Sequence, residues 1–285
     1  MASTNWPEKP KGCDIIKQQK TGSLVRLAER WAYAHDPQNL IRIMPAKGEL
    51  RRFQPPPIAG RWFLFLEVLM ANRAVIVANG LLAPETNWPE MLLPGDLLIA
   101  ADGGGRLFLA AHRAPHYLIG DFDSLAPTEL DALAALGAQA LQHPVRKDET
   151  DLELAVNLAL DHGMDDILIF AGLGGRWDHT LANLMMLALP RLGTARLRLL
   201  DGCQELTLLR PGQTHRIDGK IGDAVSLIPV GGDAKRVTTS GLEYPLLDSS
   251  LLFGRTLGVS NQMNAPEATV ALYEGLLICV VIHNA

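Results

Sequence analysis

Short apolar runs recur from residue 73 onward, and this pattern constrains the fold of the chain more than any other feature. Four strand-like runs cover residues 74–78, 96–101, 117–119 and 167–170, and glycine follows each within two residues. Segments with helical period separate them. Because apolar strands that alternate with helices indicate a parallel sheet covered on both faces, the sequence predicts a doubly wound, mainly parallel α/β domain over residues 70–205.

Helix signals support this domain. Pro127 suits a first helical turn, and Gly137 marks the end of that helix. Thr150 and Glu153 form the pattern of a capping box, with Thr150 as the cap and Glu153 as its reciprocal partner. The other expected elements are helices over 106–112 and from Thr180, and short strands over 138–143 and 195–200.

The helical period is absent after about Leu206. Short apolar runs, separated by Gly, Pro, Asp and Asn, cover residues 206–209, 224–228, 236–239, 269–273 and 276–282. Glu274-Gly275, between the last two runs, predicts a hairpin turn. We therefore expect a smaller antiparallel β-sandwich over residues 206–285.

Residues 1–69 differ from the rest. Residues 1–72 carry eleven Lys and Arg against six Asp and Glu, a net charge of +5, which leaves −10 for residues 73–285. One interpretation is a disordered basic extension that contacts the acidic body. The other, which we favour as a hypothesis, is that Met70 is the true translation start and residues 1–69 are not translated.

Composition excludes several classes of function. A net charge of −5 gives no reason to expect nucleic acid or an acidic membrane surface as a partner. Cys13, Cys203 and Cys279 are odd in number and far apart, so neither a disulfide framework nor a zinc site is indicated. The apolar stretch 62–70 is too short to span a bilayer. We expect a cytoplasmic protein.

Two carboxylates follow the third strand. Asp121 and Asp123 are two residues apart, so in an extended backbone their side chains point the same way. They come where a buried strand ends, the edge at which open α/β sheets bind ligands. Adjacent carboxylates repel, and Mg²⁺ suits one or two of them together with substrate phosphates. The alternative is a polar loop with an Asx turn.

The other strand ends carry similar residues: Asp102 before three glycines, Lys147-Asp148-Glu149-Thr150-Asp151, and Gly174-Gly175-Arg176-Trp177-Asp178-His179. Glycines allow backbone N–H groups to approach phosphate, which Lys147 and Arg176 can neutralise. Each cluster also has a structural explanation. In this alternative, Asp151 only complements a helix dipole, Asp178 is an N-cap, Asp102 serves a Gly-rich turn, Lys147 is solvated, and His179 is a surface or capping histidine. Neither a P-loop nor a GxGxxG motif is present.

Together these residues resemble the thiamine pyrophosphokinase family. The motifs that carry the resemblance are Ala101-Asp102-Gly103-Gly104, Gly120-Asp121-Phe122-Asp123-Ser124, residues 147–155, residues 172–179, residues 239–246 and Ser260-Asn261. They occur in the right order over residues 73–285. That combination is specific, whereas no single motif would be.

The resemblance implies a homodimer that uses Mg²⁺ to transfer the pyrophosphoryl group of ATP to thiamine, giving thiamine diphosphate and AMP. It implies that Asp121, Asp123 and Asp151 are catalytic and hold the metal. It implies an ATP site formed by Asp102, Gly103, Lys147, Asp148, Thr150, Gly174, Arg176, Asp178 and His179. It places Tyr244, Ser260 and Asn261 in the thiamine pocket of the partner chain. Many members of the family have tryptophan where Tyr244 stands.

Three other functions share parts of this pattern. They are a pyrophosphokinase acting on another hydroxymethyl heterocycle such as a pterin, a metal-dependent phosphoesterase, and a non-catalytic thiamine- or nucleotide-binding protein. The β domain with its Tyr244 and Ser260-Asn261 motifs favours thiamine as the acceptor. The carboxylates of the family motifs are all present at the predicted strand ends, which favours an enzyme.

Overall fold

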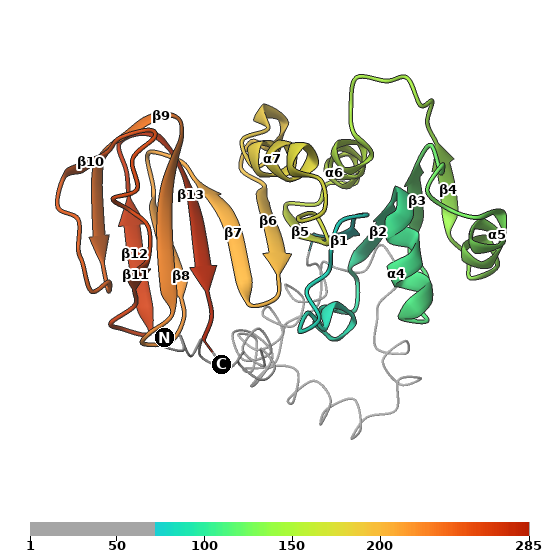
Figure 1. Ribbon diagram of the computed structural model, residues 1–285, viewed down its shortest axis with the longest axis horizontal. Helices are drawn as coiled ribbons and strands as arrows, with labels where there is room; N and C mark the ends of the chain where they lie inside the picture. Colours follow the sequence, from blue (N-terminus) through green and yellow to red (C-terminus); the bar gives the residue numbers. More distant parts are fainter. Residues whose placement is uncertain (1–71, 285) are drawn as a thin grey trace, which may run out of the picture. The chain divides into compact units, whose positions relative to one another are not determined.

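The computed structural model describes residues 72–284, and the interpretations of residues 1–69 and of a start at Met70 lie outside this range (Figure 1). Six parallel strands form its first half: β1 (Arg73–Val77), β2 (Leu97–Ala101), β3 (Tyr117–Gly120), β4 (Gln139–Gln142), β5 (Asp166–Phe170) and β6 (Arg196–Asp201). Their order in the sheet is β4-β3-β2-β1-β5-β6, and all five neighbouring pairs are parallel. The doubly wound topology is confirmed.

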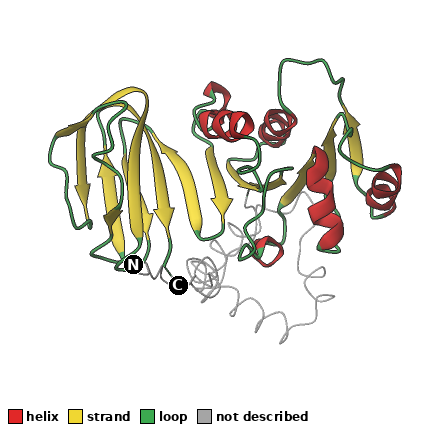
Figure 2. Cartoon of the chain, viewed as in Figure 1, coloured by secondary structure: helices red, strands yellow, loops and turns green. Residues whose placement is uncertain are grey.

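Helices cover both faces of this sheet (Figure 2). They are η2 (Trp88–Met91), η3 (Asp102–Gly104), α4 (Gly105–Ala110), α5 (Pro127–Ala135), α6 (Asp151–Asp161), α7 (Trp177–Met186) and η4 (Pro190–Leu192). Within residues 72–284 none of them is long and apolar enough to cross a membrane.

The strands divide their side chains between two cores. Ile76 and Ile169 pack in one buried cluster with Val156 of α6. Val77 and Phe170, the next residue along in each strand, pack in the other cluster with Phe108 of α4. Because successive side chains of a strand point to opposite faces, continuous apolar runs place the sheet between two helical layers.

The helix starts follow the sequence signals in part. Thr150 caps α6, since its Oγ1 accepts the Glu153 backbone N–H at 3.2 Å. Gly137 follows α5 with φ +99°, as a helix stop requires. The expected start of α7 at Thr180 is wrong: the helix begins at Trp177, and Arg176 rather than Asp178 occupies the N-cap position.

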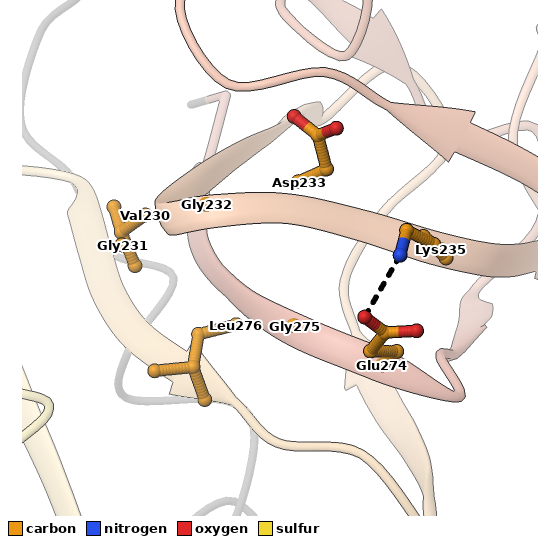
Figure 3. A pocket seen from close by; sticks show the side chains of 8 residues that line it. All are labelled: Val230, Gly231, Gly232, Asp233, Lys235, Glu274, Gly275 and Leu276. Atoms are coloured by element: carbon orange, nitrogen blue, oxygen red, sulfur yellow. Dashed lines mark hydrogen bonds and ion pairs between the residues drawn. The ribbon is translucent and has the colours of Figure 1, made fainter.

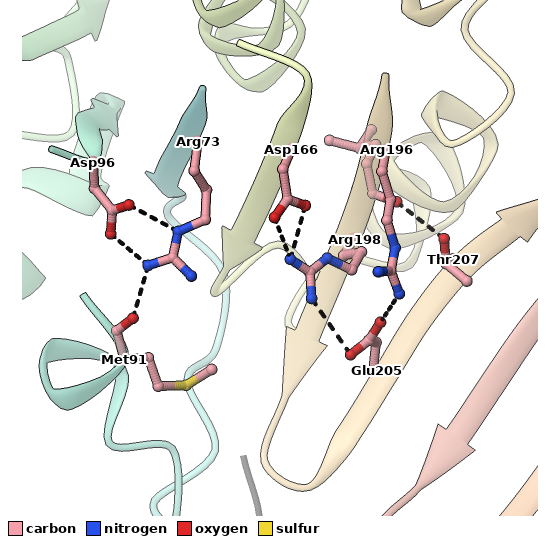
Figure 4. Close-up of polar contacts among 9 residues, drawn as sticks. Arg73, Met91, Asp96, Asp166, Arg196, Arg198, Glu205 and Thr207 are labelled. Atoms are coloured by element: carbon pink, nitrogen blue, oxygen red, sulfur yellow. Dashed lines mark hydrogen bonds and ion pairs between the residues drawn. The ribbon is translucent and has the colours of Figure 1, made fainter. Parts of the chain in front are cut away.

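Ion pairs fasten the amino ends of the strands (Figure 4). Arg73 donates to both carboxylate oxygens of Asp96, at 2.8 and 2.6 Å. Arg198 donates to Asp166 at 2.8 Å and lies 3.7 Å from Glu205. Arg73, Asp96 and Asp166 lie where β1, β2 and β5 begin, at the edge of the parallel sheet opposite its carboxyl ends.

Seven strands form the antiparallel second half: β7 (Gln204–Leu209), β8 (Thr214–Asp218), β9 (Ala224–Ser240), β10 (Ser249–Leu251), β11 (Asn261–Gln262), β12 (Glu267–Ala271) and β13 (Glu274–Ile282). β7 pairs antiparallel with β6, so hydrogen bonding continues from the parallel strands into β7, β13, β9, β12 and β8. Residues from β8, β9, β12 and β13 share one buried cluster. The predicted α/β domain followed by a smaller antiparallel β domain is confirmed.

Two details of the β domain differ from expectation. The predicted strands 224–228 and 236–239 are parts of the single strand β9, which has an irregularity near Gly231-Gly232. The predicted hairpin at Glu274-Gly275 is wrong, because β12 pairs with β8 and β9 while β13 pairs with β7 and β9. The two strands are neighbours in sequence only.

The irregularity in β9 creates a shallow pocket of about 350 Å³ (Figure 3). Lys235 donates to Glu274 across it at 2.9 Å. Gly275 approaches the chain so closely that a Cβ there would lie 2.3 Å from the Asp233 carbonyl oxygen. None of the predicted site residues lines this pocket.

Candidate active site

Three carboxylates converge at the carboxyl edge of the parallel sheet. Asp102 follows β2, Asp121 follows β3, and Asp151 is the first residue of α6. One oxygen from each lies within 4.8 Å of the others. Three negative charges this close repel one another strongly unless cationic groups lie among them.

Glycines make this convergence possible. A Cβ on Gly120 would lie 3.2 Å from the Asp102 Cβ and 3.3 Å from the Asp151 Cγ, and its φ of +151° also favours glycine. A Cβ on Gly104 would lie 2.0 Å from the Val77 carbonyl oxygen. Larger residues at these two positions would push the loops, and hence the carboxylates, apart.

Asp102 is the most buried of the three, with 8% of its surface exposed. Its Oδ2 accepts hydrogen bonds from Ser124 Oγ at 2.5 Å and from Asn79 Nδ2 at 3.3 Å. Its Oδ1 is buried and has no hydrogen-bond partner among the described residues. Since buried polar atoms are nearly always partnered, an oxygen without a partner among the described residues, in a carboxylate that lies close to two others, fits a hard divalent cation.

Asp123 lies beside this group of three. The chain is not extended here, because Phe122 has φ +66°, so the expected same-side projection of Asp121 and Asp123 does not hold. Asp123 instead donates its backbone N–H to Asp121 Oδ1 at 3.1 Å, which is an Asx turn. Its Oδ1 lies 3.3 Å from Ser124 Oγ, the same hydroxyl that contacts Asp102.

Lys147 brings a positive charge into the cluster. Its Nζ donates to Asp151 Oδ1 at 2.6 Å, and 12% of the side chain is exposed. Asp148 and Thr150 are exposed in the same loop, where Thr150 also caps α6. The cap therefore fixes the start of the helix that presents Asp151.

Residues 174–179, which lead into α7 and form its first turn, are exposed, and Gly174 and Gly175 give this segment a backbone with positive φ. Gly174 has φ +79° and donates its N–H to Thr180 Oγ1 at 3.1 Å. Arg176 donates to Asp178 at 2.5 Å, and this hydrogen bond lowers the pKa of the Asp178 carboxyl to about 2. His179 is exposed as well. The Asp178 carboxylate therefore holds the Arg176 side chain at the start of α7.

Tyr244 and Asn261 lie together in the β domain. The Asn261 side chain accepts the Tyr244 backbone N–H at 3.1 Å and donates to the Tyr244 carbonyl at 2.7 Å. The side chain of Tyr244 is 66% exposed. Ser260 has φ +63° and donates its N–H to Ser226 Oγ at 3.0 Å.

Sequence reasoning did not single out Asn79 and Ser124, which both contact Asp102. Asn79 stands at the end of β1, the same position relative to its strand that drew attention to Asp102. Ser124 belongs to the motif after β3. The position of each residue was a usable signal, but neither side chain carries a charge.

Two family models match the chain. "Thiamin pyrophosphokinase, catalytic domain" matches residues 89–197, and "Thiamin pyrophosphokinase, vitamin B1 binding domain" matches residues 214–277. The first covers the strand ends that bear the three carboxylates from Asp102 onward. The second covers Tyr244, Ser260 and Asn261.

Similar proteins carry the same name. Thiamine pyrophosphokinase of Bacillus subtilis (strain 168) is 31% identical over 208 residues, which are 72% of this chain and 96% of that protein. Thiamine pyrophosphokinase 1 of Arabidopsis thaliana is 33% identical over 183 residues, 60% of this chain and 66% of that protein.

Solved structures agree with the fold. The structure of thiamine pyrophosphokinase from Bacillus subtilis has a TM-score of 0.68 at 31% identity and covers 75% of this chain and 100% of that one. The structure from Geobacillus thermodenitrificans has a TM-score of 0.65 at 26% identity, over 75% of this chain and 98% of that one. This chain belongs to the thiamine pyrophosphokinase family.

Proposed function

We propose that this chain transfers the pyrophosphoryl group of ATP to the hydroxyl of thiamine, giving thiamine diphosphate and AMP. The observation that carries the proposal is the group of Asp102, Asp121 and Asp151 at the carboxyl edge of a doubly wound sheet. Family membership supplies the acceptor, since the similar proteins are named thiamine pyrophosphokinases.

The three carboxylates are suited to hold Mg²⁺. Asp102, whose buried Oδ1 has no hydrogen-bond partner among residues 72–284, provides hard oxygen ligands together with Asp121 and Asp151, and this ion prefers such ligands. Bound there, the ion would neutralise charge on the β- and γ-phosphates. Asp123, which the sequence also predicts as a ligand, lies next to the group through Ser124.

Positive charge and backbone N–H groups beside the cluster are suited to the triphosphate. We assign Lys147 and Arg176 to the phosphates and Asp178 to holding Arg176 in place. The remaining residues assigned to ATP are Gly103 in η3, Asp148 and Thr150 before α6, Gly174 before α7, and His179 in α7.

The reaction needs no covalent enzyme intermediate. The thiamine hydroxyl oxygen forms a bond to the β-phosphorus while the bond from that phosphorus to the α,β-bridging oxygen breaks in line, and AMP leaves with the bridging oxygen. The hydroxyl proton passes to a carboxylate of the Asp121 and Asp123 loop. Positioning and charge neutralisation supply most of the rate enhancement in transfers of this kind.

We further propose that the active form is a homodimer, with Tyr244, Ser260 and Asn261 of one chain serving the carboxylates of the other. Within one chain, six strand spacings separate β2 from β9, which at about 4.8 Å each is roughly 29 Å along the sheet. Tyr244 is tied to β11, which pairs with β9. A thiamine on Tyr244 is thus far from the carboxylates of its own chain.

An exposed apolar face of α7 supports association. Trp177, Leu181 and Met185 are spaced by four residues, lie on one face of the helix and are each about half exposed or more. Exposed apolar patches of this kind mark interaction sites. Because the first turn of α7 carries Asp178 and His179, which are assigned to ATP, a second chain packed on this face would lie beside the ATP site.

We place the protein in the cytoplasm. The free thiols of Cys203 and Cys279 support this assignment, since unpaired cysteines suit a reducing compartment. Burial raises the pKa of the Cys279 thiol to about 12, which keeps it protonated and unreactive.

Incubation of the purified protein with ATP, Mg²⁺ and thiamine, followed by chromatography, tests the reaction. We expect thiamine diphosphate and AMP in equal amounts, and neither without thiamine. A hydroxymethylpterin in place of thiamine tests the rival acceptor. Release of phosphate without any acceptor would indicate a phosphoesterase, and binding of both ligands without turnover would indicate a binding protein.

A further inference from the structure

Asp223 is a fully buried carboxylate in the β domain, outside every motif that carries the resemblance. It accepts three hydrogen bonds: from the Lys220 backbone N–H at 2.9 Å, from the Asn284 backbone N–H at 2.9 Å, and from His283, whose Nδ1 lies 3.0 Å from Oδ2. Burial alone would raise the pKa of the Asp223 carboxyl. The three hydrogen bonds together outweigh burial and hold this pKa below its ordinary value.

Through these contacts Asp223 joins the turn 220–223 to the end of the described chain. His283 is itself buried, and its backbone N–H donates to the Cys203 carbonyl at 2.9 Å. The Asn284 side chain donates to the Gly222 carbonyl. The turn is therefore held by its own first residue, through the Lys220 N–H, and by His283 and Asn284, which follow the last strand.

The same turn holds Met263. The Met263 backbone N–H donates to the Asp223 carbonyl at 2.8 Å, and the Gly222 N–H donates to the Met263 carbonyl at 2.8 Å. Met263 is buried, and a Cβ on Gly219 would lie 2.5 Å from its sulfur. A shift of this turn would therefore move Met263.

Met263 lies next to the residues that hold Tyr244. It forms an isolated antiparallel bridge with Leu242, and the Glu243 N–H donates to the Gln262 carbonyl at 2.8 Å. Asn261 then binds both backbone polar groups of Tyr244. The backbone from residue 261 to 263 thus connects the turn to the exposed tyrosine.

We propose that Asp223 is a positioning residue for thiamine recognition: through the turn 220–223 and Met263 it fixes the segment that presents Tyr244 and Asn261. The inference rests on the proposed function, because it requires that Tyr244 and Asn261 bind thiamine. Asp223 touches neither substrate. Its loss loosens the thiamine side of the site and leaves the carboxylates on β2, β3 and α6 unchanged.

Asp223→Asn tests the proposal, with kcat and the KM for each substrate measured on the full chain. Asp96→Asn is the matched control, because Asp96 is also buried, also accepts three hydrogen bonds, from Arg73 and Leu93, and lies in the α/β domain. Both variants lose a buried carboxylate. We expect Asp223→Asn to raise the thiamine KM about fivefold or more while the ATP KM changes less than about twofold, as loss of a hydrogen bond to a charged group predicts. Asp96→Asn should change neither.

His283 provides a second route if Asp223→Asn fails to fold. His283→Ala removes one donor and should raise the thiamine KM in the same direction, while His283→Asn, which keeps a donor near the Nδ1 position, should restore it. An equal rise of both KM values, or an unchanged thiamine KM in a folded variant, would overturn the proposal. If the wild-type protein makes no thiamine diphosphate, the proposed function itself fails, and this result is separate.

Discussion

At the scale of single residues, the position of Asp102 is the largest difference between the carboxylate roles expected from the sequence and the carboxylates that the structure brings together. The resemblance to the family implied that Asp102 belongs to the ATP site and that Asp121, Asp123 and Asp151 hold the metal. In the structure one oxygen of Asp102 lies within 4.8 Å of oxygens of Asp121 and Asp151, while the positive φ of Phe122 breaks the extended backbone that would align Asp123 with Asp121. A single residue with positive φ is not readable from a strand-end motif, so this grouping required the structure.

Asp121→Asn should abolish turnover and leave the fold intact. Removal of one charge from the cluster should lower kcat by at least about 100-fold, the usual scale for loss of a preorganised charge partner. Because repulsion within the cluster falls, the thermal midpoint should not decrease. Asp131→Asn, an exposed carboxylate on α5, is the control and should behave like the wild type.

Asp123→Asn tests whether Asp123 holds the metal, as the sequence predicts, or only lies beside the group of three carboxylates, as in the structure. The sequence predicts the same loss of turnover as for Asp121→Asn. Near-wild-type rates for either variant, measured at saturating Mg²⁺, would refute the metal assignment.

Tyr244→Ala should raise the KM for thiamine more than the KM for ATP. Its exposed ring is suited to stack on the cationic ring of thiamine, and loss of such a contact corresponds to roughly tenfold in affinity. Tyr244→Trp keeps an aromatic platform and should preserve the thiamine KM. An equal rise of both KM values in steady-state kinetics would place Tyr244 elsewhere.

At the scale of elements, the α/β half was largely predictable and the β half was not. Strands such as β1 and β5 are buried on both faces, so their apolar runs are continuous and end at glycine. In β9 the pattern is interrupted by Gly231-Gly232, and only pairing with β13 shows that the strand continues. Short strands such as β10 and β11 owe their form to β9 rather than to their own sequence.

Thr150→Ala should destabilise the protein because it removes the cap of α6. The Thr150 hydroxyl accepts the Glu153 N–H, and loss of an N-cap of this type costs about 1 kcal/mol of unfolding free energy. Denaturant unfolding monitored by circular dichroism measures it. Thr150→Ser keeps the acceptor and should retain stability, and an unchanged midpoint for Thr150→Ala would show that the cap contributes nothing.

At the scale of the whole molecule, one hydrogen-bonded series of strands carries both halves of the proposed site. The sequence predicted an α/β domain followed by a β domain, and in the structure β6 and β7 join the two halves edge to edge. Asp102 and Asp121 follow β2 and β3, whereas Tyr244 is bonded to Asn261 of β11 beside β9, so the two groups lie far apart in the sheet order. Six strand spacings between the two halves support the proposed homodimer, which the resemblance to the family also implies.

Mixing two defective variants tests whether the site is shared between chains. Asp121→Asn lacks the carboxylate but keeps Tyr244, and Tyr244→Ala/Asn261→Ala lacks the thiamine residues but keeps the carboxylates. If each site combines two chains, a heterodimer contains one intact site. Random exchange of subunits makes half of the dimers heterodimers, so activity should recover to about a quarter of wild type in a two-fold symmetric assembly.

The thiamine concentration in this assay must lie below the KM of the double variant, so that each variant alone is nearly inactive. A mixture of Asp121→Asn with a second metal-side variant, Asp151→Asn, is the control and should recover nothing, because no pairing restores a complete set of carboxylates. If the Asp121→Asn and Tyr244→Ala/Asn261→Ala mixture also recovers nothing after subunit exchange, each site is built within one chain. Tyr244 would then have to reach its own carboxylates across six strand spacings of the sheet, and its assignment to thiamine would fail.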